Sequence, residues 1–198
     1  MKQLLLTLGL FIFSICSFAQ NEDNDTIESL PIDKSTYVGK IVNKKFYRLP
    51  SFEQRLVFGS HVITLTPVIY KVNIDDNVVF YLSLEYINGS EKPRYAIIKY
   101  DDLIELKKVF EVLIDQGKSV TTTGDASFIQ GSYTTSTDVE VGYNVRSYYK
   151  NKKKGEVDYV KKWYISHTDY KRFTYDFESY EDLYKLFCDA LAKIESLR

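Results

Sequence analysis

The fold class is indicated by residues 73–100, which read NIDDNVVFYLSLEYINGSEKPRYAIIKY. Every second residue from Val78 to Tyr86 is apolar or aromatic, and this alternation is typical of a strand with one buried face. Turn-forming residues flank the strand at 73–77 and 88–90. Because parallel strands need a crossover of a dozen or more residues, such short connections predict antiparallel pairing.

Outward from this stretch the same pattern recurs on both sides. Further strands are expected over 38–47, 61–72 and 94–100. A helix is expected over 102–117, with Asp102 and Glu105 at capping-box spacing and Gly117 at its end. One stripe of this helix is predicted to be core, and it consists of Leu103, Leu106, Phe110, Leu113 and Ile114.

The second half of the chain repeats this plan. Strands are expected over 139–145, 157–165 and 173–177, before a final helix capped by Ser179 and Asp182. The two helix starts also match, since residues 100–103 read YDDL and residues 180–183 read YEDL. The pattern suggests internal duplication of a β-β-β-α unit. Two unrelated halves that share a common motif are the alternative.

These elements predict an α+β, two-layer domain: an antiparallel meander sheet with two helices packed on one face. A strongly bent sheet or partial barrel closed by the last helix is the rival arrangement. The predicted organisation is a signal peptide (1–19), a flexible acidic leader (20–35), a first β-meander plus helix half (36–117), a Ser/Thr-rich connector (118–138) with a short strand around Phe128, and a second β-meander plus helix half (139–198).

The N-terminus has the pattern of an export signal. Lys2 precedes an apolar run of about ten residues, and a small-x-small end at 17–19 predicts cleavage after Ala19. The protein is therefore expected in the periplasm or outside the cell, with no transmembrane segment after cleavage. Residues 13–16 (FSIC) also resemble a bacterial lipoprotein signal, although Ile15 is bulkier than that pattern favours. Acylation at Cys16 is the alternative.

Composition and motifs exclude several functions. With 26 basic and 27 acidic residues, the chain lacks the basic excess of a nucleic-acid-binding protein. Two cysteines are too few for a disulfide scaffold or a four-cysteine zinc site. No phosphate-loop, dinucleotide, zinc-protease or serine-hydrolase motif occurs. His61 and His167 each lack a neighbouring ligand. We therefore predict no catalytic residue, metal or cofactor, and a protein that is not an enzyme.

Aromatic content is the one compositional excess, with 17 tyrosines and 12 phenylalanines. Tyrosine combines an apolar ring with a polar tip, which suits a ligand-binding surface as well as a half-wet sheet. Tyr148, Tyr164 and Tyr170 are the predicted stacking groups for a saccharide, a peptide or a protein. Two alternatives remain: a structural or assembly component of the bacterial cell envelope, with or without a lipid anchor, and an enzyme whose site is assembled from dispersed residues. The sequence does not indicate the oligomeric state.

Overall fold

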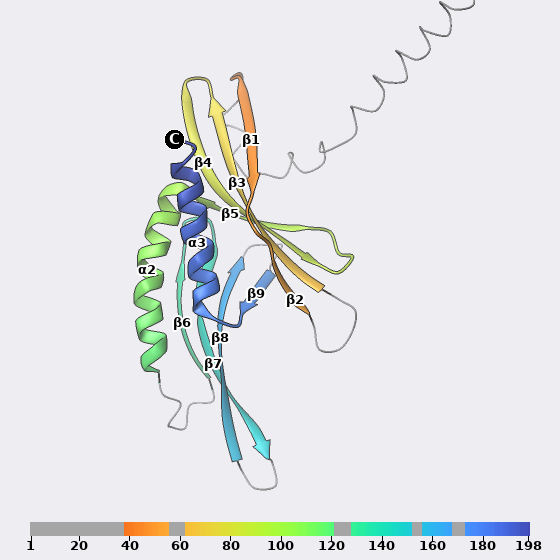
Figure 1. Cartoon of the computed structure of the whole chain (residues 1–198), viewed down its shortest axis with the longest axis vertical. Helices are drawn as coiled ribbons and strands as arrows, with labels where there is room; N and C mark the ends of the chain where they lie inside the picture. The colour runs from red at the N-terminus through yellow and green to blue at the C-terminus, as the bar shows by residue number, and fades with distance from the viewer. Residues whose placement is uncertain (1–37, 56–61, 121–127, 152–155, 168–172) are drawn as a thin grey trace, which may run out of the picture. The chain divides into compact units, whose positions relative to one another are not determined.

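The computed structural model describes residues 38–55, 62–120, 128–151, 156–167 and 173–198 (Figure 1). The predicted signal peptide (1–19) and acidic leader (20–35) lie outside the described residues, and so do His61 and Tyr170.

The described strands form two antiparallel sheets. The first sheet has the order β1-β3-β4-β5, and β2 also pairs with β3. It consists of β1 (Val42–Arg48), β2 (Phe52–Arg55), β3 (Val62–Ile74), β4 (Asn77–Asn88) and β5 (Arg94–Lys99). The second sheet has the order β6-β7-β8-β9. It consists of β6 (Phe128–Thr134), β7 (Val139–Asn151), β8 (Glu156–His167) and β9 (Phe173–Phe177).

The predicted α+β class, with an antiparallel meander and two helices, is confirmed. The strands divide between two sheets because a long helix follows β5, and the chain starts new pairings at β6. Strand β2 has no counterpart in the predicted elements, whereas β6 includes the short strand expected around Phe128. The duplication stays a prediction, because the sheets differ in strand number and order.

Helix α2 (Tyr100–Ser119) begins two residues earlier than predicted. Its N-cap residue, Lys99, makes no side-chain cap hydrogen bond. The predicted capping box at Asp102 and Glu105 is therefore wrong. The carboxylate of Asp102 instead accepts a 2.6 Å hydrogen bond from the hydroxyl of Ser136, so its partner comes from a distant segment rather than from the helix terminus.

The core stripe predicted for α2 is confirmed, since all five of its residues are buried. The sequence predicts that Gly117 ends the helix, but Gly117 lies buried inside α2. A Cβ at Gly117 would come within 2.6 Å of the Trp163 ring. Close packing against β8 therefore explains the glycine at this position, and the prediction that it stops the helix is wrong.

Helix α3 (Tyr180–Glu195) begins where the sequence predicts. The hydroxyl of Ser179 accepts a hydrogen bond from the backbone N–H of Asp182 at 3.3 Å, which satisfies one of the free donors of the first turn. Its half-buried Cys188 is a free thiol. Within the described chain, neither helix is long and apolar enough to cross a membrane.

The two helices lie side by side and pack on both sheets (Figure 1). The ring of Phe110 on α2 meets Trp163 of β8 and Phe187 of α3 edge-on, with centroids 5.7 and 5.5 Å away. The sheets also touch through aromatic pairs, of which Tyr86 and Phe173 stack at 4.8 Å. One hydrophobic core therefore joins both sheets and both helices.

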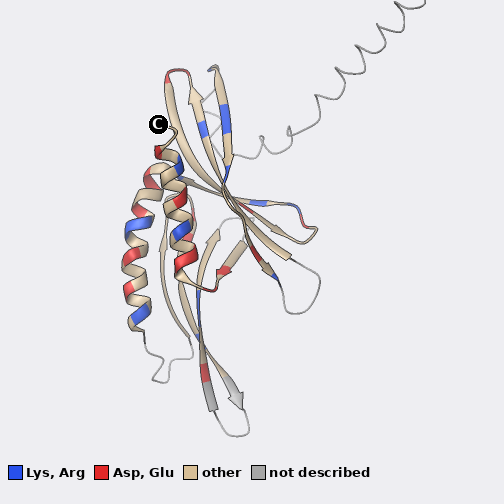
Figure 2. Cartoon of the chain, viewed as in Figure 1, with Lys and Arg blue, Asp and Glu red and all other residues tan. Residues whose placement is uncertain are grey.

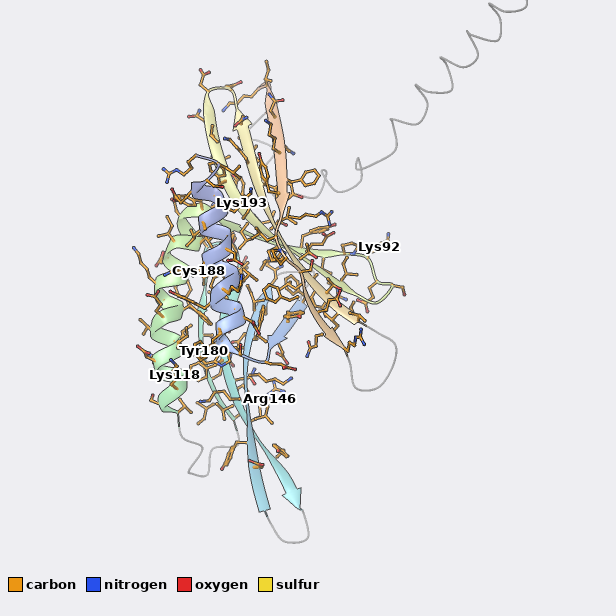
Figure 3. The ribbon with its side chains drawn as sticks, in the orientation of Figure 1. Lys92, Lys118, Arg146, Tyr180, Cys188 and Lys193 are labelled. Atoms are coloured by element: carbon orange, nitrogen blue, oxygen red, sulfur yellow. The ribbon has the colours of Figure 1, made fainter. Side chains whose placement is uncertain are left out.

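Charged and aromatic side chains reinforce the helix junction near its surface. The ammonium of Lys118, near the end of α2, lies 4.6 Å from the ring centre of Tyr180 at the start of α3 (Figure 3). Such a cation–π contact contributes about 0.5–1 kcal/mol at an exposed site. It holds the last turn of one helix against the first turn of the next.

Candidate functional site

The first sheet has a second face, opposite the one that packs on the helices. Ile69 of β3 and Leu82 of β4 belong to the core, and their immediate neighbours point the other way because successive side chains of a strand alternate. The residues of β1, β3, β4 and β5 that alternate with the core residues are called the outer face below. Strand register aligns them in rows that run across the sheet.

One row of the outer face is aromatic. Phe46 of β1 is paired with Tyr70 of β3, Tyr70 with Tyr81 of β4, and Tyr81 with Lys99 of β5. The rings of Phe46 and Tyr70 lie 6.3 Å apart and are tilted by 43°. Phe46 is 44% exposed, so part of its ring is accessible for stacking. This row is called the aromatic row.

A buried carboxylate lies four residues along β4 from the aromatic row. Glu85 is paired with Thr66 on one side and with Tyr95 on the other. The hydroxyl of Tyr95 donates a 3.3 Å hydrogen bond to Oε1 of Glu85, and Nη1 of Arg48 lies 3.7 Å from Oε2. A buried charge is costly unless it has partners, and these two groups supply them.

The surroundings of Glu85 raise the pKa of two tyrosine hydroxyls. Burial raises the pKa of Tyr95 to about 12, and the negative charge of Glu85 adds to the effect. Burial also raises the pKa of Tyr70, with a further contribution from Glu85 and an opposing one from Arg48. Both hydroxyls therefore stay protonated across the physiological range and act as hydrogen-bond donors.

Arg48 differs from its partners in being open to solvent. Its side chain is 59% exposed, whereas that of Glu85 is 10% exposed. The guanidinium has five N–H donors in a fixed planar arrangement, so it can pair with Glu85 and still offer donors on its solvent side. The outer face thus combines an accessible aromatic ring, a cation that can reach a ligand and a hydrogen-bonded carboxylate behind it.

Basic side chains continue along the edge of this sheet. Lys44, Lys45 and Arg48 all lie on β1, the terminal strand of the first sheet (Figure 2). Charged residues on an edge strand discourage pairing with another chain. Lys44 and Arg48 lie on the same face of β1 as Phe46, so these two also give that side of the outer face a positive character.

Two of the three predicted ligand-binding tyrosines lie on the second sheet, and Tyr170 is outside the described residues. Tyr164 is buried, and its hydroxyl donates to Glu140 at 2.7 Å and accepts from Gln130 at 2.5 Å. Tyr148 is 46% exposed.

The two described tyrosines share a face of the second sheet but are not brought together. Tyr164 is paired with Gly142, which lies six residues from Tyr148 along β7. Burial raises the pKa of Tyr164 to about 12, and its hydrogen bond to Glu140 adds to the effect. Because Tyr164 is buried and Tyr148 is exposed, the ring of Tyr148 is the more accessible of the two for stacking.

The outer-face residues Phe46, Tyr70 and Glu85 were not singled out from the sequence. One signal was present, since Tyr81, Ser83 and Glu85 alternate with the apolar residues of their strand. Alternation shows that these side chains share a face, but it does not show which strands lie beside them. The aromatic row exists only because β1, β3 and β4 are neighbours in a particular register.

The described residues contain no group of three or more His, Cys, Asp or Glu side chains placed to hold a metal ion. His167 lies at the end of β8, with its ring centre 6.4 Å from that of Phe173. Its Nδ1 is buried and makes no hydrogen bond to the described part of the chain. His61 lies outside the described residues.

Comparison with protein-family models, with curated proteins and with solved structures finds no match to this chain.

Proposed function

We propose that this protein is an exported, non-enzymatic binding module that takes a saccharide on the outer face of its first sheet. The observation that carries the proposal is the aromatic row beside the Arg48–Glu85–Tyr95 group. Export rests on the signal-peptide pattern of residues 1–19. The non-enzymatic character rests on the lack of a catalytic motif in the sequence.

A saccharide matches this surface better than an apolar ligand does. The C–H face of a sugar ring packs on an aromatic ring, while its hydroxyls need both donors and acceptors nearby. Phe46 supplies the exposed ring, Arg48 supplies donors, and Glu85 supplies an acceptor that is already hydrogen-bonded to Tyr95. A few placed polar groups among aromatic side chains are typical of small-molecule sites.

Titration of the protein with chitohexaose and cellohexaose tests the site. For the sugar that binds, we expect Phe46→Ala and Arg48→Ala each to raise the dissociation constant about tenfold. Phe46→Ala removes stacking, and Arg48→Ala removes hydrogen bonds. Both side chains are exposed, but Arg48→Ala also removes an ion-pair partner of the buried Glu85, so the fold of that variant is checked by circular dichroism before titration. The affinity is measured by calorimetry on folded variants.

Tyr148→Ala is the matched control, because it removes an exposed aromatic ring from the second sheet. It should leave the affinity unchanged. If Tyr148→Ala weakens binding while Phe46→Ala does not, the ligand site lies on the second sheet, as the sequence predicts. If no sugar of the panel binds, the saccharide proposal is wrong.

The intact mass of the mature protein, purified from its native cells, tests the export proposal. We expect an unmodified chain that begins at Gln20, because the small-x-small end of the signal lies at 17–19. A chain that begins at Cys16 and carries acyl mass would contradict free export. It would favour the alternative role as a lipid-anchored component of the cell envelope.

A further inference from the structure

Strand β4 is paired on both sides along only part of its length. It pairs with β3 from Asn77 to Asn88, but with β5 only from Tyr81 to Tyr86. Strand β5 ends at Lys99, where the chain turns into α2. Among the described residues, 77–80 therefore have a strand neighbour on one side only. This stretch is called the open edge.

An open edge offers backbone groups for pairing. Along an antiparallel strand, alternate residues direct both their N–H and their C=O to the same side. On β4 these groups point to β3 at one residue and away from it at the next. Unpaired groups of this kind are a template for an added strand, and several peptide-binding domains recognise their ligands in this way.

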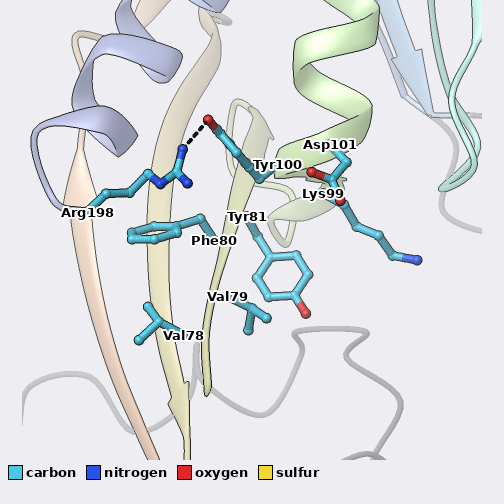
Figure 4. A pocket seen from close by; sticks show the side chains of 8 residues that line it. All are labelled: Val78, Val79, Phe80, Tyr81, Lys99, Tyr100, Asp101 and Arg198. Carbon is cyan, nitrogen blue, oxygen red and sulfur yellow. Dashed lines mark hydrogen bonds between the residues drawn. The ribbon is translucent and has the colours of Figure 1, made fainter. Parts of the chain in front are cut away.

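A cavity of ≈ 290 Å³ lies beside the open edge (Figure 4). Val78 and Phe80 line it on the side of the strand that carries Arg198, and Val79 and Tyr81 line it on the other side (Figure 4). Val78 is 50% exposed. An added strand would alternate its side chains between these two sides, so each side would receive every second residue.

Two cations lie at the end of the cavity nearest helix α2. Lys99 is exposed and Arg198 is 54% exposed, and both line the cavity with a single carboxylate, that of Asp101. Figure 4 shows Arg198 pointing to Tyr100, whose hydroxyl accepts a 3.0 Å hydrogen bond from Nη1. The same nitrogen lies 3.2 Å from Oε1 of Glu195. The guanidinium is thus held in place, and other N–H donors of the group remain for a ligand.

We infer that the open edge of β4 binds an extended acidic peptide of another protein, which adds to the first sheet as a further strand. An apolar side chain of the peptide packs on Val78 and Phe80, and a carboxylate meets Lys99 or Arg198. Charge complementarity selects an acidic segment over a basic one. Tyr81 and Lys99 line this cavity and also lie in the aromatic row, but the inference does not rest on the saccharide proposal, whose test residues are Phe46 and Arg48.

The probe is the acetylated and amidated peptide Glu-Thr-Val-Thr-Val-Glu, with a second peptide in which lysine replaces both glutamates. Backbone amide shifts are followed by two-dimensional NMR during titration of the full mature chain. We expect the acidic peptide to move the amide signals of 77–80 and to bind about tenfold more tightly than the basic peptide.

Charge reversal at the site tests the role of the cations. Lys99→Glu and Arg198→Glu, made singly, should each weaken the acidic peptide about tenfold and improve the basic one. Lys92→Glu is the matched control, because Lys92 is exposed in the β4–β5 connection and does not line the cavity. It changes the net charge equally and should leave both affinities unchanged.

Several results would overturn the inference. These are no shifts at 77–80, equal affinity for the two peptides, or an equal effect of Lys92→Glu and Lys99→Glu. Self-association of the protein without peptide, abolished by Val78→Lys, would show that the edge binds a second copy instead. Failure of the protein to bind a sugar would not contradict this inference. The saccharide test uses variants of Phe46 and Arg48, whereas the peptide test uses variants of Lys99 and Arg198.

Discussion

Phe110→Ala is expected to lower the free energy of unfolding by about 3–5 kcal/mol. Phe110 is fully buried and lies where α2, β8 and α3 meet, with its ring edge-on to Trp163 and Phe187. Removing the ring takes away its apolar contacts and leaves a cavity that three packed elements close only in part. Urea unfolding followed by the fluorescence of Trp163, the single tryptophan of the chain, measures the loss.

Val112→Ala is the matched control for this prediction. Val112 lies on the same helix but is exposed, so its truncation should change the free energy of unfolding by about 0.5 kcal/mol or less. A loss below about 1 kcal/mol for Phe110→Ala would contradict its place in the core. Circular dichroism checks that each variant keeps its helices before unfolding.

Gly142→Ala is expected to lower the free energy of unfolding by about 3 kcal/mol. Gly142 lies in β7 opposite Ser132 of β6. A Cβ at this position would come 2.2 Å from the carbonyl oxygen of Gly131 and 2.9 Å from Cα of Ser132. Because these are backbone atoms of the neighbouring strand, no side-chain rotation relieves the contact, and β6 itself has to move.

Gly131→Ala provides the comparison, because its added Cβ would meet only side-chain atoms of Tyr143, at 2.6–2.8 Å. The ring can shift, so we expect a smaller loss of about 1–2 kcal/mol. Thr134→Ser, at an exposed position of β6, should change stability by about 0.5 kcal/mol or less. Equal losses for the two glycine variants would rule out backbone crowding as the cause.

Much of the secondary structure follows from local patterns. The alternation from Val78 to Tyr86 predicted β4, and the turn residues at 73–77 predicted its connection to β3. Ser179 predicted the start of α3, because a hydroxyl followed by a helical stripe satisfies the free N–H groups of the first turn. Local signals were sufficient here because the partner groups lie within a few residues.

Local patterns were misleading where a contact with a distant residue determines the role of a side chain in the structure. Gly117 has the position of a helix stop, yet it lies inside α2 because the Trp163 ring occupies the space of its Cβ. Asp102 has the spacing of a capping residue, yet its carboxylate pairs with Ser136. In both cases the partner is more than 30 residues away, so no local window contains it.

The candidate site was likewise predictable only in part, because its residues come from strands far apart in the chain. The tyrosine excess predicted a binding surface, and the individual tyrosines chosen on β7 and β8 are not neighbours in the sheet. The aromatic row of Phe46, Tyr70 and Tyr81 needs three strands in one register. A shift of one residue in any pairing would move one of these rings to the other face of the sheet.

The sequence by itself therefore determined the antiparallel α+β class, most of the elements and the start of α3, because period-two and helical patterns act over a few residues. Only the tertiary structure decided that the strands form two sheets, that Glu85 lies between Arg48 and Tyr95, and that β4 has an open edge. These features depend on strand order and register. Both arise from core contacts between residues far apart in the chain, which a local pattern does not encode.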